Sequence, residues 1–190
     1  MLAGGESRRF GQNKAQAVFN GRRLIDHAVS CALALSNRAL VISGKQIADL
    51  PSSVSQYPDR LSGKGPLGGI HAALYYADTP WVAILPVDMP FLQPRVYRFL
   101  ASFADRAKVV VVKSEKGLEP MVSLWAKETM SEVNDCLQNN RLSIHRFLRD
   151  LPATEVDFPA EYPEYRPEIF ANINTRADFE RLTKLTETDI

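Results

Sequence analysis

Short apolar runs alternate with amphipathic segments along the first half of the chain. The runs predict strands at Ala39–Ile42, Val54–Tyr57 and Trp81–Leu85. The last of these runs is continuous, which is typical of a strand buried in a parallel sheet. Helical spacing of apolar residues predicts helices over 23–35, from residue 69 to 76 and over 94–103. Together with a short first strand at Met1–Ala3, this alternation predicts a doubly wound α/β sheet.

The second half of the chain predicts a more mixed arrangement. Two strands, Val109–Val112 and Met121–Trp125, are expected on either side of a charged turn. Helices are expected over 127–137 and 142–148, followed by a polar stretch with several prolines. A last strand is expected at Ile169–Ile173, and then a helix from Thr175, with this threonine as its N-cap. The expected organisation is a single mixed α/β domain spanning residues 1–190.

Composition and charge limit the classes of protein to which this chain can belong. The 190 residues are 45% hydrophobic and 24% charged, which is ordinary for a globular domain. No apolar run approaches the roughly 20 residues that cross a bilayer, and no signal peptide is visible, so we expect a cytoplasmic protein. A net charge of +1 gives no reason to expect nucleic acid or a membrane as a partner. Cys31 and Cys136 are expected as buried thiols.

The segment Leu2–Lys14 has the composition of an anion-binding loop. A strand that runs directly into Gly4 and Gly5 lets main-chain N–H groups converge on a phosphate. Arg8, Arg9 and Lys14 add three cations within seven residues, which suits a polyphosphate. The segment is not a P-loop, because alanine rather than serine or threonine follows Lys14. The alternative is a glycine turn with solvated surface cations.

A second glycine-rich segment covers residues 63–69. It fits the pattern G-x-G-x-x-G, and Asp88 lies 20 residues beyond Gly68. A dinucleotide-binding loop follows a strand directly, but Pro58 and a polar segment intervene here, so that interpretation is disfavoured. A loop packed against a nucleobase or ribose is favoured, and a purely structural turn remains open.

Two further segments carry candidate polar groups. Asp88 follows a buried strand between Pro86 and Pro90, at the edge where open α/β sheets bind ligands. A carboxylate in this position can hold Mg²⁺ against phosphate oxygens, or it can cap the next helix. Asn172 and Asn174 follow the expected last strand, where alternating amides suit either a polar site or a helix cap.

These four segments, in this order, resemble the molybdenum cofactor guanylyltransferase family. The family pattern has L-A-G-G-x-x-x-R-x-G-x-x-K near the N-terminus, then an Asp before G-P-L-x-G, then D-x-P, and finally N-x-N-T. It stands here as Leu2–Lys14, Asp59 with Gly65–Gly69, Asp88–Pro90 and Asn172–Thr175. The resemblance spans nearly the whole chain. It implies a Rossmann-like nucleotidyltransferase fold, with a mostly parallel sheet and helices on both faces.

The resemblance also implies an activity and a distribution of roles. GMP would be transferred from GTP to the phosphate of molybdenum-molybdopterin, and pyrophosphate would be released. Residues 1–105 would form the nucleotide-binding half and residues 106–190 the acceptor-binding half. Proteins that deliver molybdopterin or mature molybdoenzymes would be possible contacts. The nucleotide-binding residues implied are Leu2, Ala3, Gly4, Gly5, Lys14, Asp59, Gly68, Asp88, Asn172 and Asn174.

The implied catalytic groups are cationic, apart from the metal ligand. Lys14, Arg8 and Arg9 would neutralise the phosphates, and Asp88 would hold Mg²⁺ as the cofactor. Other interpretations remain open: a related transferase that uses CTP or another phosphate acceptor, a GTP-binding module without transfer, and an NAD-dependent oxidoreductase that uses the loop over 63–68.

Overall fold

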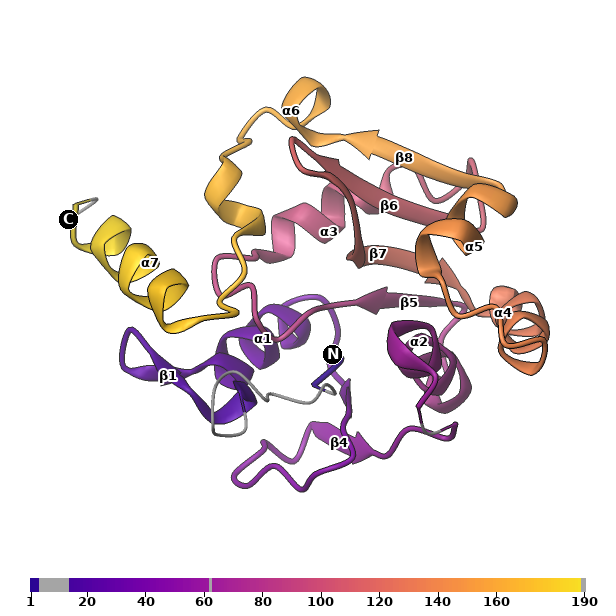
Figure 1. The fold of residues 1–190 in the computed structure, drawn as a ribbon, viewed down its shortest axis with the longest axis horizontal. Coiled ribbons are helices and arrows are strands. Elements are labelled where there is room, and N and C mark those ends of the chain that lie inside the picture. The colour runs from indigo at the N-terminus through magenta and orange to yellow at the C-terminus, as the bar shows by residue number, and fades with distance from the viewer. Residues whose placement is uncertain (4–13, 62, 189–190) are drawn as a thin grey trace.

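A row of strands forms the centre of the molecule (Figure 1). The computed structural model describes residues 1–3, 14–61 and 63–188. The strands are β1 (Val18–Phe19), β2 (Arg22–Arg23), β3 (Ala39–Ile42), β4 (Val54–Tyr57), β5 (Trp81–Ile84), β6 (Val109–Ser114), β7 (Gly117–Ala126) and β8 (Ala153–Asp157). The α-helices are α1 (Leu24–Leu33), α2 (Gly65–Tyr76), α3 (Pro94–Ala101), α4 (Met130–Gln138), α5 (Ile144–Asp150), α6 (Phe158–Glu161) and α7 (Arg176–Thr188). Three 3₁₀ turns complete the set: η1 (Lys14–Gln16), η2 (Lys127–Thr129) and η3 (Pro167–Phe170).

The first three residues join two groups of strands into one row. Leu2 makes parallel bridges to Ile42 and to Pro86, so Met1–Ala3 lies between β3 and the end of β5. The resulting order is β4, β3, Met1–Ala3, β5, β7, β6 and β8. All of these run parallel except β7, which is antiparallel to both β5 and β6. The expected mostly parallel sheet with a short first strand is therefore confirmed.

Helices cover both faces of the sheet, because successive apolar residues of its strands point their side chains to opposite faces. Val110 and Val112 belong to one apolar core, whereas Val109 and Val111 belong to the other. The first core includes side chains of α1, α3 and α6, and the second includes side chains of α2, α4 and α5. Figure 1 shows β8, β6, β7 and β5 side by side, with α7 and α4 at opposite ends of the molecule. None of the helices within the described ranges is long and apolar enough to cross a membrane.

The structure corrects two predicted elements and adds the strand β8. Helix α2 begins at Gly65 rather than at residue 69, since Pro66 fits the first turn of a helix. The expected strand Ile169–Ile173 is instead η3 followed by irregular chain, because Pro167 presets a helical φ at its start. Strand β8 was not predicted, because its polar residues and the preceding proline are not typical of a strand inside a sheet. In the structure it is an edge strand that pairs with β6.

The start of α7 is capped as the sequence predicts. Thr175 Oγ1 accepts a hydrogen bond from the Asp178 amide at 3.1 Å, and Asp178 Oδ2 accepts one from the Thr175 amide at 2.9 Å. This reciprocal pair is a capping box with aspartate as its second member. The hydrogen bond from Thr175 holds the pKa of the Asp178 carboxyl below its usual value. The chain is therefore firmly oriented just before α7.

Candidate functional site

The candidate site lies along the edge at which β3, β4 and β5 end, which we call the carboxyl edge. These three strands and Met1–Ala3 run in the same direction, so the residues that follow them gather at one edge. Ligands of open α/β sheets bind outside this edge. Ser43, Asp59 and Asp88 each stand within four residues of such a strand end.

Three polar side chains from distant parts of the sequence meet at this edge. Lys14 Nζ donates to Asp88 Oδ2 at 2.7 Å and to Asn174 Oδ1 at 2.5 Å. The Lys14 and Asp88 side chains are 21% and 27% exposed, so a ligand can reach the pair. We call these three residues the Lys14 cluster. It unites three of the four sequence segments that carried candidate chemistry.

Backbone contacts fix the position of Asn174 relative to Asp88. The Ile173 amide donates to the Asp88 carbonyl oxygen at 2.9 Å, which attaches the C-terminal segment to the end of β5. The Asn174 amide donates to Asp178 Oδ2 at 3.1 Å, so the capping box of α7 also orients this asparagine. Asn172 is half-buried nearby, and none of the described polar contacts joins it to the Lys14 cluster.

Asp59 occupies the other end of the carboxyl edge. It follows β4 by two residues, and β3 and Met1–Ala3 separate β4 from β5. Three strand spacings place Asp59 roughly 14 Å from Asp88, a span that a nucleoside triphosphate can bridge. The Oδ1 atom of Asp59 is buried without a hydrogen-bond partner among the described residues. Burial raises the pKa of this carboxyl above its usual value of 3.8.

Asp59→Asn is therefore expected to stabilise the protein in the absence of ligand. Because the folded-state pKa is raised, the ionised carboxyl destabilises the fold above that pKa, and this cost disappears as the pH falls below about 3.8. We expect the melting temperature at pH 7 to rise by about 1 to 4 °C, the shift that up to about 1 kcal/mol produces at this size. Thermal melts at pH 7 and pH 3.5 check this, since the gain should vanish at the lower pH. A lower melting temperature at pH 7 would contradict it.

Leu2 and Ala3 lie in the sheet between β3 and the end of β5, and Gly68 lies on α2. The Leu2 amide donates to Leu85 O and the Ala3 amide donates to Ile42 O, both at 3.0 Å. A Cβ on Gly69 would lie 3.1 Å from a methyl group of Leu2, and one on Gly68 would lie 2.9 Å from Lys64 Cβ. The two glycines therefore let α2 approach the first strand and its own loop closely. Whether Gly68 also touches a nucleotide remains a prediction.

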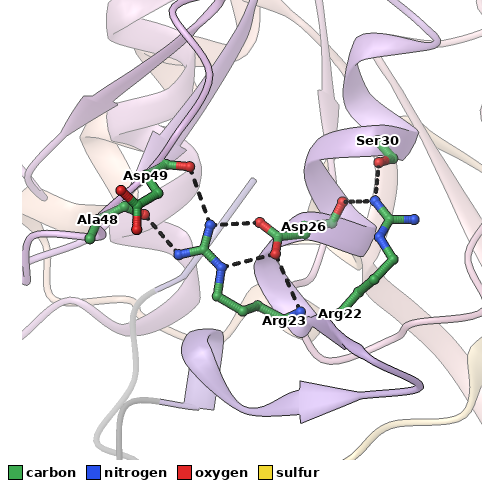
Figure 2. Close-up of polar contacts among 6 residues, drawn as sticks. All are labelled: Arg22, Arg23, Asp26, Ser30, Ala48 and Asp49. Carbon is green, nitrogen blue, oxygen red and sulfur yellow. Dashed lines mark hydrogen bonds and ion pairs between the residues drawn. The ribbon is translucent and has the colours of Figure 1, made fainter.

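Arg23 joins the start of α1 to the loop between β3 and β4 (Figure 2). Its guanidinium donates two hydrogen bonds to the Asp26 carboxylate, at 2.9 and 2.8 Å. It also donates to Ala48 O at 2.8 Å and to Asp49 O at 3.2 Å, in the loop between β3 and β4. Asp49 has a positive φ of 55°, which this contact helps to stabilise. The hydrogen bonds that Arg23 donates to the Asp26 carboxylate lower the pKa of Asp26.

Glu119 is a candidate site residue that sequence reasoning did not identify. It lies on β7 and accepts a hydrogen bond from Ser114 Oγ at 2.8 Å. Burial raises its pKa, and the negative charge of Asp88 acts in the same direction. The β6–β7 register shifts beside this point, between Val111 and Val112, as bulges near ligand sites often do. The detectable signal was a carboxylate inside an otherwise apolar strand.

Several predicted residues lie outside the described part of the chain. Gly4, Gly5, Arg8 and Arg9 fall within residues 4–13, so their predicted roles in phosphate and nucleotide binding remain predictions. Cys31 is a buried free thiol as expected, and Cys136 is half-buried and also free.

The oxygens of the Lys14 cluster fit a magnesium ion. Asp88 Oδ2 and Asn174 Oδ1 are hard oxygen donors, and both lie within 2.7 Å of one point that already holds a cation, the Lys14 ammonium. Within residues 1–3, 14–61 and 63–188, no group of three His, Cys, Asp or Glu side chains could hold a metal. A magnesium ion here would complete its shell with water and substrate phosphate, as Mg²⁺ commonly does.

Comparison with known protein sequences identifies the family. Residues 1–156 match the MobA-like NTP transferase domain. A probable molybdenum cofactor guanylyltransferase of Geobacillus sp. (strain WCH70) is 30% identical, over 95% of this chain and 94% of the relative. The corresponding protein of Bacillus subtilis (strain 168) is 33% identical, over 94% of this chain and 90% of the relative.

Solved structures show the same fold. Molybdopterin-guanine dinucleotide biosynthesis protein A from Archaeoglobus fulgidus superimposes with a TM-score of 0.81 at 21% identity, covering 98% of this chain and 97% of that one. A 2-C-methyl-D-erythritol 4-phosphate cytidylyltransferase from Thermus thermophilus gives 0.68 at 15% identity, covering 92% and 93%. The expected nucleotidyltransferase fold is thus confirmed. With its carboxyl edge, its motifs and these relatives, the chain belongs to the family of MobA-like NTP transferase domains, as its resemblance to molybdenum cofactor guanylyltransferases indicated.

Proposed function

We propose that this protein transfers GMP from GTP to the phosphate of molybdenum-molybdopterin, forming the guanine dinucleotide cofactor and pyrophosphate. The observation that carries the proposal is the Lys14 cluster, which places a cation, a carboxylate and an amide at the ligand-binding edge of a nucleotidyltransferase fold. The names of the sequence relatives supply the acceptor and the nucleotide. We further propose that the protein acts in the cytoplasm and meets the proteins that deliver molybdopterin and mature molybdoenzymes.

The chemistry requires no nucleophile from the protein. An oxygen of the acceptor phosphate attacks the α-phosphorus of GTP; one P–O bond forms, and the bond to the β-phosphate oxygen breaks. The electron pair of that bond leaves with pyrophosphate. The protein therefore contributes mainly by positioning the two phosphates and by neutralising their charge.

Each described residue has a distinct part in this proposal. Lys14 binds the β- and γ-phosphate oxygens, whose charge increases as pyrophosphate departs. Asp59 accepts hydrogen bonds from the guanine base. Leu2 and Ala3 contact the nucleoside. Asp88 and Asn174 would hold Mg²⁺, which would supply neutralisation of the charge on the α-phosphate. Glu119 lies on the acceptor half beside Asp88, where the molybdopterin phosphate would enter.

The proposal is tested by supplying GTP labelled in the α-phosphate, Mg²⁺ and molybdenum-molybdopterin to the purified protein. We expect pyrophosphate and a guanylylated product of matching amount, detected by mass spectrometry, and neither one without the acceptor. Nucleotide binding without pyrophosphate release would instead support a binding module. Transfer from CTP in preference to GTP, or to another phosphate acceptor only, would leave the broader nucleotidyltransferase assignment.

A further inference from the structure

The ammonium of Lys14 occupies the position that a metal ion needs. Its Nζ lies 2.7 Å from Asp88 Oδ2 and 2.5 Å from Asn174 Oδ1, the two described oxygens that fit magnesium. A divalent cation bound to both oxygens would stand close to where Nζ stands, and two cations at this range repel each other, so the ammonium and the metal cannot hold this oxygen pair together.

From this geometry we infer that Lys14 and the metal ion are alternative occupants of the Asp88–Asn174 oxygen pair. Without nucleotide, Lys14 holds both oxygens and excludes the metal. With nucleotide, the phosphates offer Lys14 a better partner, and its withdrawal frees the two oxygens. The metal therefore enters with the nucleotide rather than before it. This inference rests on the proposed metal and phosphate roles, but not on the identity of the acceptor.

The arrangement couples two binding events through one side chain. A nucleotide that draws Lys14 away raises the affinity for metal, and a metal that displaces Lys14 raises the affinity for nucleotide by the same factor. The coupling depends on the positive charge of Lys14, because this charge competes with the metal for the two oxygens. The side chain of Asn174 is neutral and does not repel a metal. Asp178 accepts a hydrogen bond from the main-chain N–H of Asn174, so the backbone that carries this asparagine is held independently of Lys14.

Binding of Mn²⁺ alone, measured by electron paramagnetic resonance on the purified protein without nucleotide, tests this inference. We expect wild-type protein to bind Mn²⁺ weakly and Lys14→Met to bind it at least about tenfold tighter, which corresponds to about 1.4 kcal/mol. Lys14→Arg keeps the cation and should remain weak. Lys108→Met removes one positive charge at the opposite edge of the sheet, where Lys108 pairs with Glu132, and should leave Mn²⁺ affinity unchanged.

A second arm repeats the titration with a non-hydrolysable GTP analogue. The analogue should raise the Mn²⁺ affinity of the wild type, and this increase should exceed the increase in Lys14→Met. Adding Asp88→Asn to Lys14→Met should abolish the tighter binding, which locates it at this oxygen pair. If Lys14→Met fails to fold, as judged by its melting curve, Lys14→Gln takes its place with the same expectation.

Equal Mn²⁺ affinity in the wild type and in the folded neutral variant would overturn the inference. Weaker Mn²⁺ binding in the neutral variant would also overturn it, because Lys14 would then support the metal site. The metal-only arm uses no nucleotide and no acceptor, so it is independent of transfer activity. A protein that fails to transfer GMP but shows the expected Mn²⁺ affinities would refute the proposed function and leave this inference intact.

Discussion

Asp88→Asn is expected to lower the rate of GMP transfer by at least about a hundredfold. The substitution keeps the shape of the side chain but removes the charge that pairs with Lys14 and that the proposed metal site requires. A loss of this size is typical when one preorganised electrostatic stabiliser is removed from a reaction that develops charge. Because Asp88 is partly exposed, the melting temperature should change little. Steady-state measurement of pyrophosphate release with GTP, Mg²⁺ and acceptor checks the prediction.

Asp157→Asn provides a matched control for this variant. Asp157 also pairs with a lysine, Lys113, at 3.1 Å, but it lies at the end of the edge strand β8. Removing its charge should therefore leave the transfer rate within about twofold, as expected for an exposed ion pair. Near-normal turnover in Asp88→Asn would refute the metal role of Asp88, and Asp59 and Glu119 would become the next candidates.

The fold was most predictable where local pattern and tertiary environment agree. Strands β3 and β4 have the predicted bounds, because β3 is a short apolar run, β4 has apolar residues at both ends, and both lie between turn-forming residues. The strand expected at Ile169–Ile173 was wrong, although the segment is apolar and buried, since periodicity over so few residues does not separate a strand from a helical turn. The antiparallel direction of β7 comes from its tight turn to β6 at Gly117, which has a φ of 108°.

The candidate site was predictable as a set of residues but not as an arrangement. Asp88, Lys14 and Asn174 were identified one segment at a time, from glycines, strand ends and cations. Their contact joins residues up to 160 positions apart, and it depends on the attachment of Ile173 to Asp88. Glu119 was missed because the sequence predicted a charged turn between the strands Val109–Val112 and Met121–Trp125, whereas β7 already begins at Gly117. Its position next to Asp88 depends on pairing between β5 and β7, which local sequence does not encode.

GTP is expected to be used with a kcat/KM at least about a hundredfold higher than that of CTP or ATP. Guanine carries adjacent donors at N1 and at the 2-amino group, which match the two oxygens of one carboxylate. Asp59 offers such a carboxylate, with one oxygen buried and unpartnered among the described residues. Adenine would instead turn the lone pair of its N1 toward Asp59, and cytosine would offer a single amino donor. Buried polar groups left unpaired by the wrong base give discrimination of this size or greater.

Competition between nucleotides at equal concentrations, with Mg²⁺ and molybdenum-molybdopterin present, measures this preference. Asp59→Asn should lower the ratio of GTP to ATP use by at least about tenfold, because an amide presents one acceptor and one donor in place of two acceptors. Asp49→Asn is the matched control: this exposed residue contacts Arg23 through its main-chain oxygen, so the variant should keep the wild-type ratio. Equal or better use of CTP or ATP by the wild type would refute the guanylyl assignment. An unchanged ratio in Asp59→Asn would leave that assignment standing but remove Asp59 from recognition of the base.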